Sequence, residues 1–240
     1  MKKTLKKITG FQLFLPIVAL ILVLLFNMIK TPDFFKITVL NGTLYGFMID
    51  IINRASELAI LAIGMTLVVA SSAGTDISVG AVSAVTAAII CYSLGPDQQN
   101  YQMPYLVGIL LGLLGGVLCG MWNGLLVAKM RIQPMVATLI LFTAGRGISQ
   151  LICAGQIIHV EKESYRILGS FIPKVPLPTP VFVAAALALV TWLVLKKTAL
   201  GMYIQAIGIN RRAGRLIGIN SQMIIFMTYA YCGLCSGIAG

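Results

Sequence analysis

The chain has 240 residues, of which 58% are hydrophobic and only 10% are charged, whereas about a quarter of the residues in a soluble domain are charged. Long apolar runs without period-two alternation recur along its length. They exclude a soluble globular fold and predict an all-α, polytopic bundle of transmembrane helices. The net charge of +11 is explained better by membrane orientation than by nucleic-acid binding, because cytoplasmic loops of membrane proteins collect Lys and Arg.

Seven apolar segments are predicted to cross the membrane. In chain order they are Phe11–Ile29, Ala55–Ala70, Ile77–Leu94, Pro104–Ala128, Met135–Cys153, Pro180–Leu195 and Gln222–Gly240. The segment Tyr45–Arg54 is expected to be a helical lead-in to the second span. Lysines precede the first span and no small-residue cleavage site follows it, so we interpret it as an uncleaved span and not as a signal peptide.

The distribution of charge predicts the orientation. Most Lys and Arg residues fall on one side of the membrane when the N-terminus is placed in the cytoplasm. The basic segment Lys196–Asn220 then lies inside, and the loop Ala154–Thr179, expected to be irregular, lies outside. We interpret residues 1–240 as one membrane-spanning domain. The apolar run that ends at Gly240 suggests that further C-terminal spans are missing.

Small polar residues interrupt the apolar pattern between the second and third spans, in the segment Ser71–Gly80. This predicted discontinuity contains Gly74, Thr75, Asp76 and Ser78. An acidic residue in or near hydrocarbon is a functional hypothesis by default, and non-helical backbone at membrane depth can line a translocation path. The alternative is a tight turn at the inner interface in which Asp76 caps the next helix; the two interpretations are compatible.

Arg146 is a second charged residue within a predicted span. It follows Met135 by eleven residues, which places it roughly 17 Å into a helix, and Gln150 follows on the same face. A contact with a sugar hydroxyl group or an ion pair with Asp76 would each explain Arg146. The ion pair is favoured, because charged groups within membranes tend to pair.

Glycines repeat every four residues along the fourth predicted span. Gly112, Gly116 and Gly120 form the centre of this stripe, which is typical of close helix packing. The Cys232-x-x-Cys235 pair lies in the last predicted helix without a second pair, so helix packing is favoured over metal binding.

The basic segment Lys196–Asn220 contains the signals of a short helix. Asn210 is a good N-cap residue, Arg211–Ile217 would form two turns, and Gly218 stands where a helix ends. Arg211 and Arg212 fall in the first turn, where the helix dipole disfavours cations. An acidic partner surface or a lipid headgroup is therefore expected beside them.

No nucleotide-binding or hydrolase motif occurs in the sequence. The chain is therefore not expected to be an enzyme or to hold a cofactor or metal. If transport is driven by ATP, another chain must bind the ATP.

An ordered series of motifs runs along the chain: Ala62–Val69, Thr75–Gly80, Pro134–Leu139, Gly145–Gly147 and Gly201–Asn210 followed by Arg215–Ile219. This series resembles the membrane permeases of ribose-type sugar ABC importers. Within that family, the segments Pro32–Phe35, Ile49–Ala55, Ala154–Ile157 and Lys197–Met202 resemble permeases of the galactofuranose type most closely. Two positions depart from the pattern of the family. Ala73 stands where a Gly is usual, and Gly214 stands where an Ala is usual.

The resemblance implies a permease subunit of an ATP-driven sugar importer in the plasma (inner) membrane. Its implied partners are a second permease copy or a related permease, cytoplasmic ATP-binding subunits, and an extracytoplasmic sugar-binding protein. The inner loop would couple to the ATPase through Gly208, Asn210, Arg211, Arg212, Arg215 and Gly218. Two alternatives remain, namely an ion-coupled secondary transporter that uses Asp76 and Arg146, and a non-transporting membrane fragment.

Overall fold

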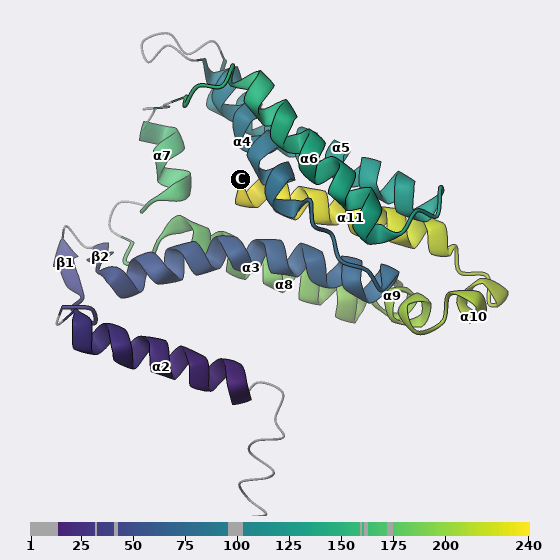
Figure 1. Ribbon diagram of the computed structural model, residues 1–240, viewed down its shortest axis with the longest axis horizontal. Coiled ribbons are helices and arrows are strands. Elements are labelled where there is room, and N and C mark those ends of the chain that lie inside the picture. Colours follow the sequence, from purple (N-terminus) through teal and green to yellow (C-terminus); the bar gives the residue numbers. More distant parts are fainter. Residues whose placement is uncertain are drawn as a thin grey trace, which may run out of the picture. The chain divides into compact units, whose positions relative to one another are not determined.

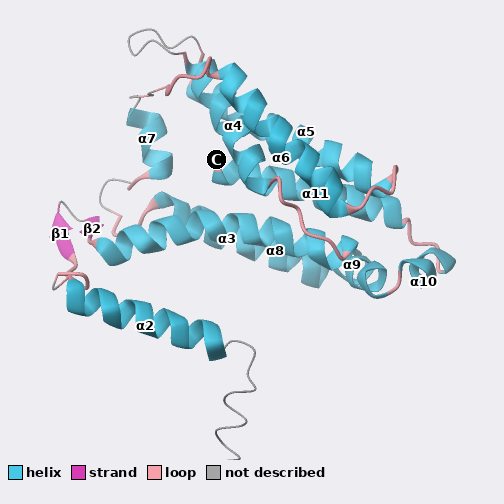
Figure 2. Cartoon of the chain, in the orientation of Figure 1, coloured by secondary structure: helices cyan, strands magenta, loops and turns pink. Residues whose placement is uncertain are grey.

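A computed structural model describes residues 14–31, 33–40, 43–95, 103–158, 160, 163–171 and 175–240. Almost all of the regular structure within these residues is helical, as predicted, and a single pair of short strands is the exception (Figures 1 and 2). The contacts divide the chain into two units. One comprises Met1–Ile52 with Pro173–Leu177, and the other comprises Asn53–Ile172 with Pro178–Gly240.

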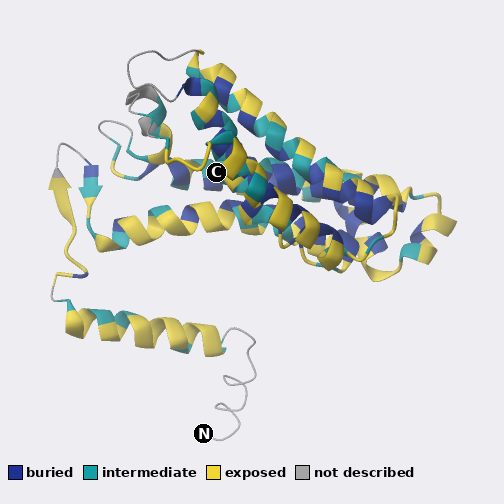
Figure 3. Ribbon diagram, turned by 45° about the horizontal axis from the view of Figure 1, so that its top comes forward, coloured by how far each residue is buried: buried dark blue, intermediate teal, exposed yellow. Residues whose placement is uncertain are grey.

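The first unit contains helix α2 and a small hairpin. α2 spans Phe14–Lys30 and buries none of its residues (Figure 3); residues 11–13 of the predicted first span lie outside the described residues. Strand β1 (Thr38–Leu40) pairs antiparallel with β2 (Thr43–Tyr45). Because Tyr45 belongs to β2, the predicted helical lead-in begins later, at the start of α3.

The named elements of the second unit are all helices, and an isolated β-bridge joins Phe171 to Pro178. This unit contains most of α3 (Phe47–Ser72), then α4 (Val79–Leu94), α5 (Tyr105–Ala128), α6 (Pro134–Ile152), α7 (Glu163–Gly169), α8 (Thr179–Lys197), α9 (Ala199–Ile209), α10 (Arg211–Leu216) and α11 (Ser221–Ala239). Helices α4, α5, α6 and α11 lie side by side (Figure 1). The main core, which includes Val68, Ile207 and Tyr229, joins α3, α5, α6, α9 and α11.

Each of the seven predicted spans is a helix in the structure. Five of these helices, α3, α5, α6, α8 and α11, are long and apolar enough to cross a membrane. α2 has 17 residues and α4 has 16 residues, so both are shorter apolar helices. The protein is therefore a multi-pass membrane protein.

The glycine stripe packs α5 against its neighbours, as predicted. A Cβ atom at Gly116 would meet the carbonyl oxygen of Gly233, and one at Gly120 would meet that of Tyr229, both in α11. Gly112 faces Ile90 of α4 in the same way. Small residues at these positions let the helix backbones approach one another closely, and they hold α5 and α11 as the most extensive helix pair in the unit.

Two loops contain helices that the sequence interpretation did not include. The outer loop, expected to be irregular, contains α7. The basic segment contains α9 as well as the predicted short helix. Gly201 and Gly208 both lie inside α9, where Gly201 packs against the backbone of Leu195 and Gly208 against that of Ala70.

Candidate functional site

The predicted discontinuity is present between α3, which ends at Ser72, and α4, which begins at Val79. Ala73 adopts a left-handed conformation with φ +54°. A non-glycine residue rarely takes this conformation, because its Cβ crowds the carbonyl oxygen at a cost of roughly 1–2 kcal/mol. Glycine would therefore suit this position, and the alanine lowers the stability of the fold by this conformational free energy.

Asp76 lies at the centre of a buried hydrogen-bond network. Only 3% of the residue is exposed. Its Oδ1 accepts hydrogen bonds from the backbone N of Ser78 at 2.8 Å and from the Oγ of Ser78 at 2.6 Å. Ser78, and not Asp76, is the N-cap residue of α4. Asp76 therefore orders the turn before the helix, which corrects the prediction that Asp76 itself caps it.

The neighbouring helices complete this network. Asn123 of α5 donates from Nδ2 to the Ser78 Oγ at 2.8 Å, and the backbone N of Ile77 donates to Thr138 of α6 at 3.2 Å. The sequence interpretation did not include Asn123; the available signal was a lone amide residue beside the glycine stripe. Asn123 stands five residues before Ala128, roughly 7.5 Å from the end of α5. The polar residues Asp76 and Ser78 are therefore buried by protein, as polar groups within a membrane require, whereas Ala73, Thr75 and Ile77 of the same segment are exposed.

The basic segment contacts the end of α3 directly. An Nη atom of Arg211 donates to the carbonyl oxygen of Ser72 at 2.6 Å. The last carbonyl groups of a helix have no partner within the helix and lie at the negative end of its dipole. Arg211 therefore supplies a hydrogen bond to the last carbonyl group of α3. An acidic partner was expected beside Arg211, and the group found there is this backbone carbonyl.

The short helix α10 forms as its cap signals predict. The Oδ1 of Asn210 accepts from the backbone N atoms of Arg212 and Ala213 at 3.0 and 3.1 Å. Gly218 has φ +85°, and the backbone N of Ile219 donates to the carbonyl oxygen of Gly214 at 3.0 Å. This is the glycine-terminated helix end expected at Gly218.

Arg146 does not join the discontinuity. It is exposed, and its guanidinium carbon lies 4.7 Å from the centroid of the Phe142 ring. Within the described residues no ion pair links it to Asp76, so the favoured interpretation is wrong. The physical reason is distance. The discontinuity meets α6 at Thr138, which precedes Arg146 by eight residues, or roughly 12 Å of helix.

Gln150 lines a cavity of about 660 Å³ between α4 and the end of α6. Ser149 and Gln156 add polar groups to its wall, and Ala84 and Cys91 form part of its other side. Thus the predicted path residues do not form one site, and Arg146 belongs to neither the discontinuity nor this cavity. Gly74, Thr75, Asp76 and Ser78 belong to the discontinuity, and Gln150 belongs to a separate cavity.

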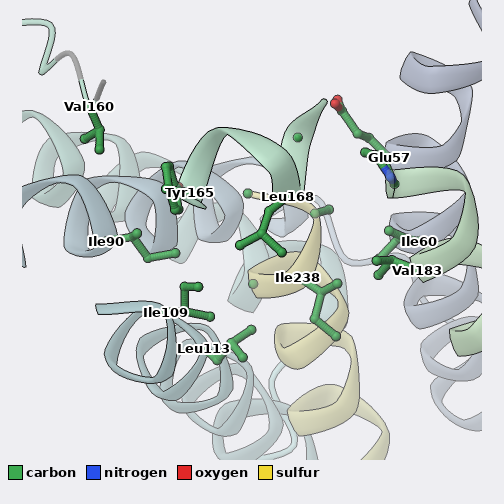
Figure 4. Close-up of a pocket in the computed structure, with 15 residues that line it drawn as sticks. Glu57, Ile60, Ile90, Ile109, Leu113, Val160, Tyr165, Leu168, Val183 and Ile238 are labelled. Carbon is green, nitrogen blue, oxygen red and sulfur yellow. The ribbon is translucent and has the colours of Figure 1, made fainter. Parts of the chain in front are cut away.

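Another cavity of about 440 Å³ has mainly apolar walls. Figure 4 shows Ile60 and Val183 on one side of it and Ile109 and Leu113 on the other. Among the described residues that line it, Glu57 and Tyr165 carry polar side chains. None of the residues predicted to form a path lines this cavity.

Comparison with known proteins covers nearly the whole chain. Residues 47–240 match the family described as branched-chain amino acid transport system / permease component. The galactofuranose transporter permease protein of Escherichia coli is 47% identical over 224 residues, which cover 93% of this chain and 64% of that protein. No solved structure matches the chain.

Two further relatives are import permeases. The ribose import permease protein of Escherichia coli is 34% identical over 227 residues, covering 93% of this chain and 66% of the relative. The fructose import permease protein of Bifidobacterium longum is 33% identical over 242 residues, covering 98% of this chain and 66% of the relative. The chain thus spans about two thirds of the length of the relatives it matches. The extent of the family match shows that the chain belongs to the family of the permease component of branched-chain amino acid transport systems.

Proposed function

We propose that the chain is a transmembrane permease subunit of a sugar importer that is driven by a separate ATPase. The names of its relatives support this assignment, because they describe permeases for galactofuranose, ribose and fructose. In this proposal the N-terminus lies in the cytoplasm, ATP is bound by partner subunits, and an extracytoplasmic protein delivers the sugar.

The observation that carries the proposal is the hydrogen bond from Arg211 to the Ser72 carbonyl group. It links α10 to the place where α3 gives way to the discontinuity. Arg212, in the same turn of α10, is exposed. An ATPase that moves α10 through its exposed face would therefore act on the end of α3 directly.

The exposure of Arg146 supports a partner or a water-filled path along α6. A charged side chain within a membrane span faces a bundle interior or a wet cavity, because exposure to lipid costs several kcal/mol. In the proposed assembly a second permease copy or the translocation path covers this face of α6. Gln150 would contact sugar hydroxyl groups from the cavity that it lines with Ser149 and Gln156.

Reconstitution tests the coupling assignment. The permease is combined in nanodiscs with its ATP-binding subunits and its sugar-binding protein, and ATP hydrolysis is measured with galactofuranose, ribose and fructose. Arg212→Glu reverses an exposed charge and is expected to reduce the sugar-stimulated hydrolysis at least tenfold. Lys197→Glu, an exposed charge reversal at the end of α8, is the control. Full stimulation in Arg212→Glu would overturn the role of α10.

The ion-coupled alternative is tested separately at Asp76. Asp76→Asn keeps an oxygen that can accept the two hydrogen bonds from Ser78 but cannot carry a proton. ATP-driven uptake is expected to survive this change. Proton-driven uptake by the permease alone, lost in Asp76→Asn, would instead support a secondary transporter.

A further inference from the structure

A basic cavity lies where α10 meets the discontinuity. Its volume is about 300 Å³, at the lower end of the range of roughly 300–1,000 Å³ for small-ligand pockets. Arg131, from the turn between α5 and α6, lines it together with Arg211 and Arg215 of α10. Ser221, Gln133 and Gln222 supply neutral polar groups.

Among the described residues, no acidic side chain lines this cavity. In the described part of the chain, no ion pair joins any of these three arginines to a carboxylate. Three like charges around one cavity repel one another. An anion within the cavity would remove that repulsion.

The arginines keep donors available for such an anion. Arg211 donates to the Ser72 carbonyl oxygen, and Arg215 donates from Nε to the Ser221 Oγ at 3.0 Å. A guanidinium group has five N–H donors, so each of these two retains several. Arg131 is held in a left-handed conformation with φ +58°, which is uncommon for a residue other than glycine.

The dipoles of the helices that end at the cavity do not determine whether its ligand is an anion or a cation. The N-terminal residues of α6 and α11 line it, and so do the C-terminal residues of α3 and α5. The positive and negative ends of the helix dipoles therefore largely offset each other, and the arginine side chains determine the preference.

We propose that this cavity binds a phosphate group. Guanidinium groups match the oxygens of phosphate in paired hydrogen bonds, and several arginines can share its oxygens. Charge distribution assigns this end of the protein to the cytoplasmic side, where anionic lipids present phosphate. Met130 and Leu216, the neighbours of Arg131 and Arg215, are 61% and 88% exposed, as suits a site at headgroup depth.

Free phosphate and lipid phosphate share this chemistry, so the experiment has two arms. The full chain is placed in phosphatidylcholine nanodiscs, and its thermal unfolding is followed while inorganic phosphate is added at constant ionic strength. In the second arm, phosphatidylglycerol is mixed into the nanodiscs. Bound phosphate is expected to raise the unfolding midpoint. A response to inorganic phosphate identifies a free anion as sufficient, and a response to phosphatidylglycerol alone identifies the lipid.

Arg131→Gln and Arg215→Gln are expected to need at least about tenfold more ligand for the same shift, because each removes charged hydrogen bonds. Arg212→Gln is the matched control, since Arg212 has the same charge and lies in the same helix but does not line the cavity. An unchanged response in Arg131→Gln and Arg215→Gln would overturn the proposal. An equal loss of ligand response in Arg212→Gln would also overturn it. So would a protein that shows no response to phosphate or phosphatidylglycerol while Arg131→Gln and Arg215→Gln capture the ATP-binding subunits less well.

Discussion

Gly208 of α9 lies directly against the carbonyl oxygen of Ala70 in α3, with no space between them for a Cβ atom. This contact sets the separation between the basic segment and the last turn of α3. Gly208→Ala is therefore expected to force α9 away from α3 and to destabilise the protein by about 1–3 kcal/mol, the usual cost of overpacking. The midpoint of thermal unfolding in detergent measures this loss.

Gly214 provides the control for that change. It lies in α10, and a Cβ atom there would meet Ile207 at an ordinary contact distance of 3.6 Å. Gly214→Ala should therefore stabilise the protein by up to about 1 kcal/mol through its higher helix propensity. If both glycine substitutions gave the same result, close packing would not be the reason for Gly208.

The glycine stripe gives a second prediction about packing. Gly120→Ala would place a Cβ atom against the backbone of Tyr229 and Gly233 in α11, and a loss of about 1–3 kcal/mol is expected. Gly147→Ala in α6 is the comparison, because nothing lies within 4 Å of its added Cβ atom. Retention of the native unfolding midpoint in Gly120→Ala would contradict the close approach of α5 and α11.

Ala73 offers a substitution that should improve stability. Ala73→Gly relieves the left-handed strain of roughly 1–2 kcal/mol, although the added freedom of the unfolded chain offsets about 0.4–1 kcal/mol of this gain. A net gain of up to about 1 kcal/mol is expected. A clear loss, seen as a lower unfolding midpoint, would mean that Ala73 does not hold this conformation in the membrane.

Ser78 connects Asp76 to Asn123, and its removal should be costly. Ser78→Ala deprives Asp76 of one hydrogen bond and leaves the buried Nδ2 of Asn123 without its acceptor, which costs about 1–3 kcal/mol. Ser93→Ala in the same helix removes only a bond to the carbonyl oxygen of Ile89. Its effect should be small, so equal losses in the two variants would argue against the network.

Local patterns predicted the helices well. Continuous apolar runs located a helix at each of the seven predicted spans, five of them long enough to cross a membrane. The cap residues Asn210 and Gly218 bounded α10 because capping depends on residues close in sequence. The repeat of Gly116 and Gly120 indicated close packing because only its spacing along one helix was needed. These signals require no knowledge of which helices become neighbours.

The errors concern contacts between distant segments. The sequence interpretation did not include α9, whose Gly201 and Gly208 lie against the backbones of Leu195 and Ala70. The predicted ion pair between Asp76 and Arg146 rested on charge alone, and the hydrogen-bond partner of Asp76 is Ser78, two residues away in the chain. Likewise, the acidic counterpart expected for Arg211 is the backbone carbonyl group of Ser72. A sequence records the charge of a side chain and not the backbone groups that will surround it.

The bond between Arg211 and Ser72 has a thermodynamic consequence that runs in both directions. Any displacement of α10 that breaks it leaves the last turn of α3 without its cap, so fraying of α3 and movement of α10 share one free-energy cost. By linkage, a ligand that bound the discontinuity and a protein that bound α10 would each raise the binding affinity of the other by the same factor. This single hydrogen bond thus couples the free energy of binding at the discontinuity to that of binding at α10.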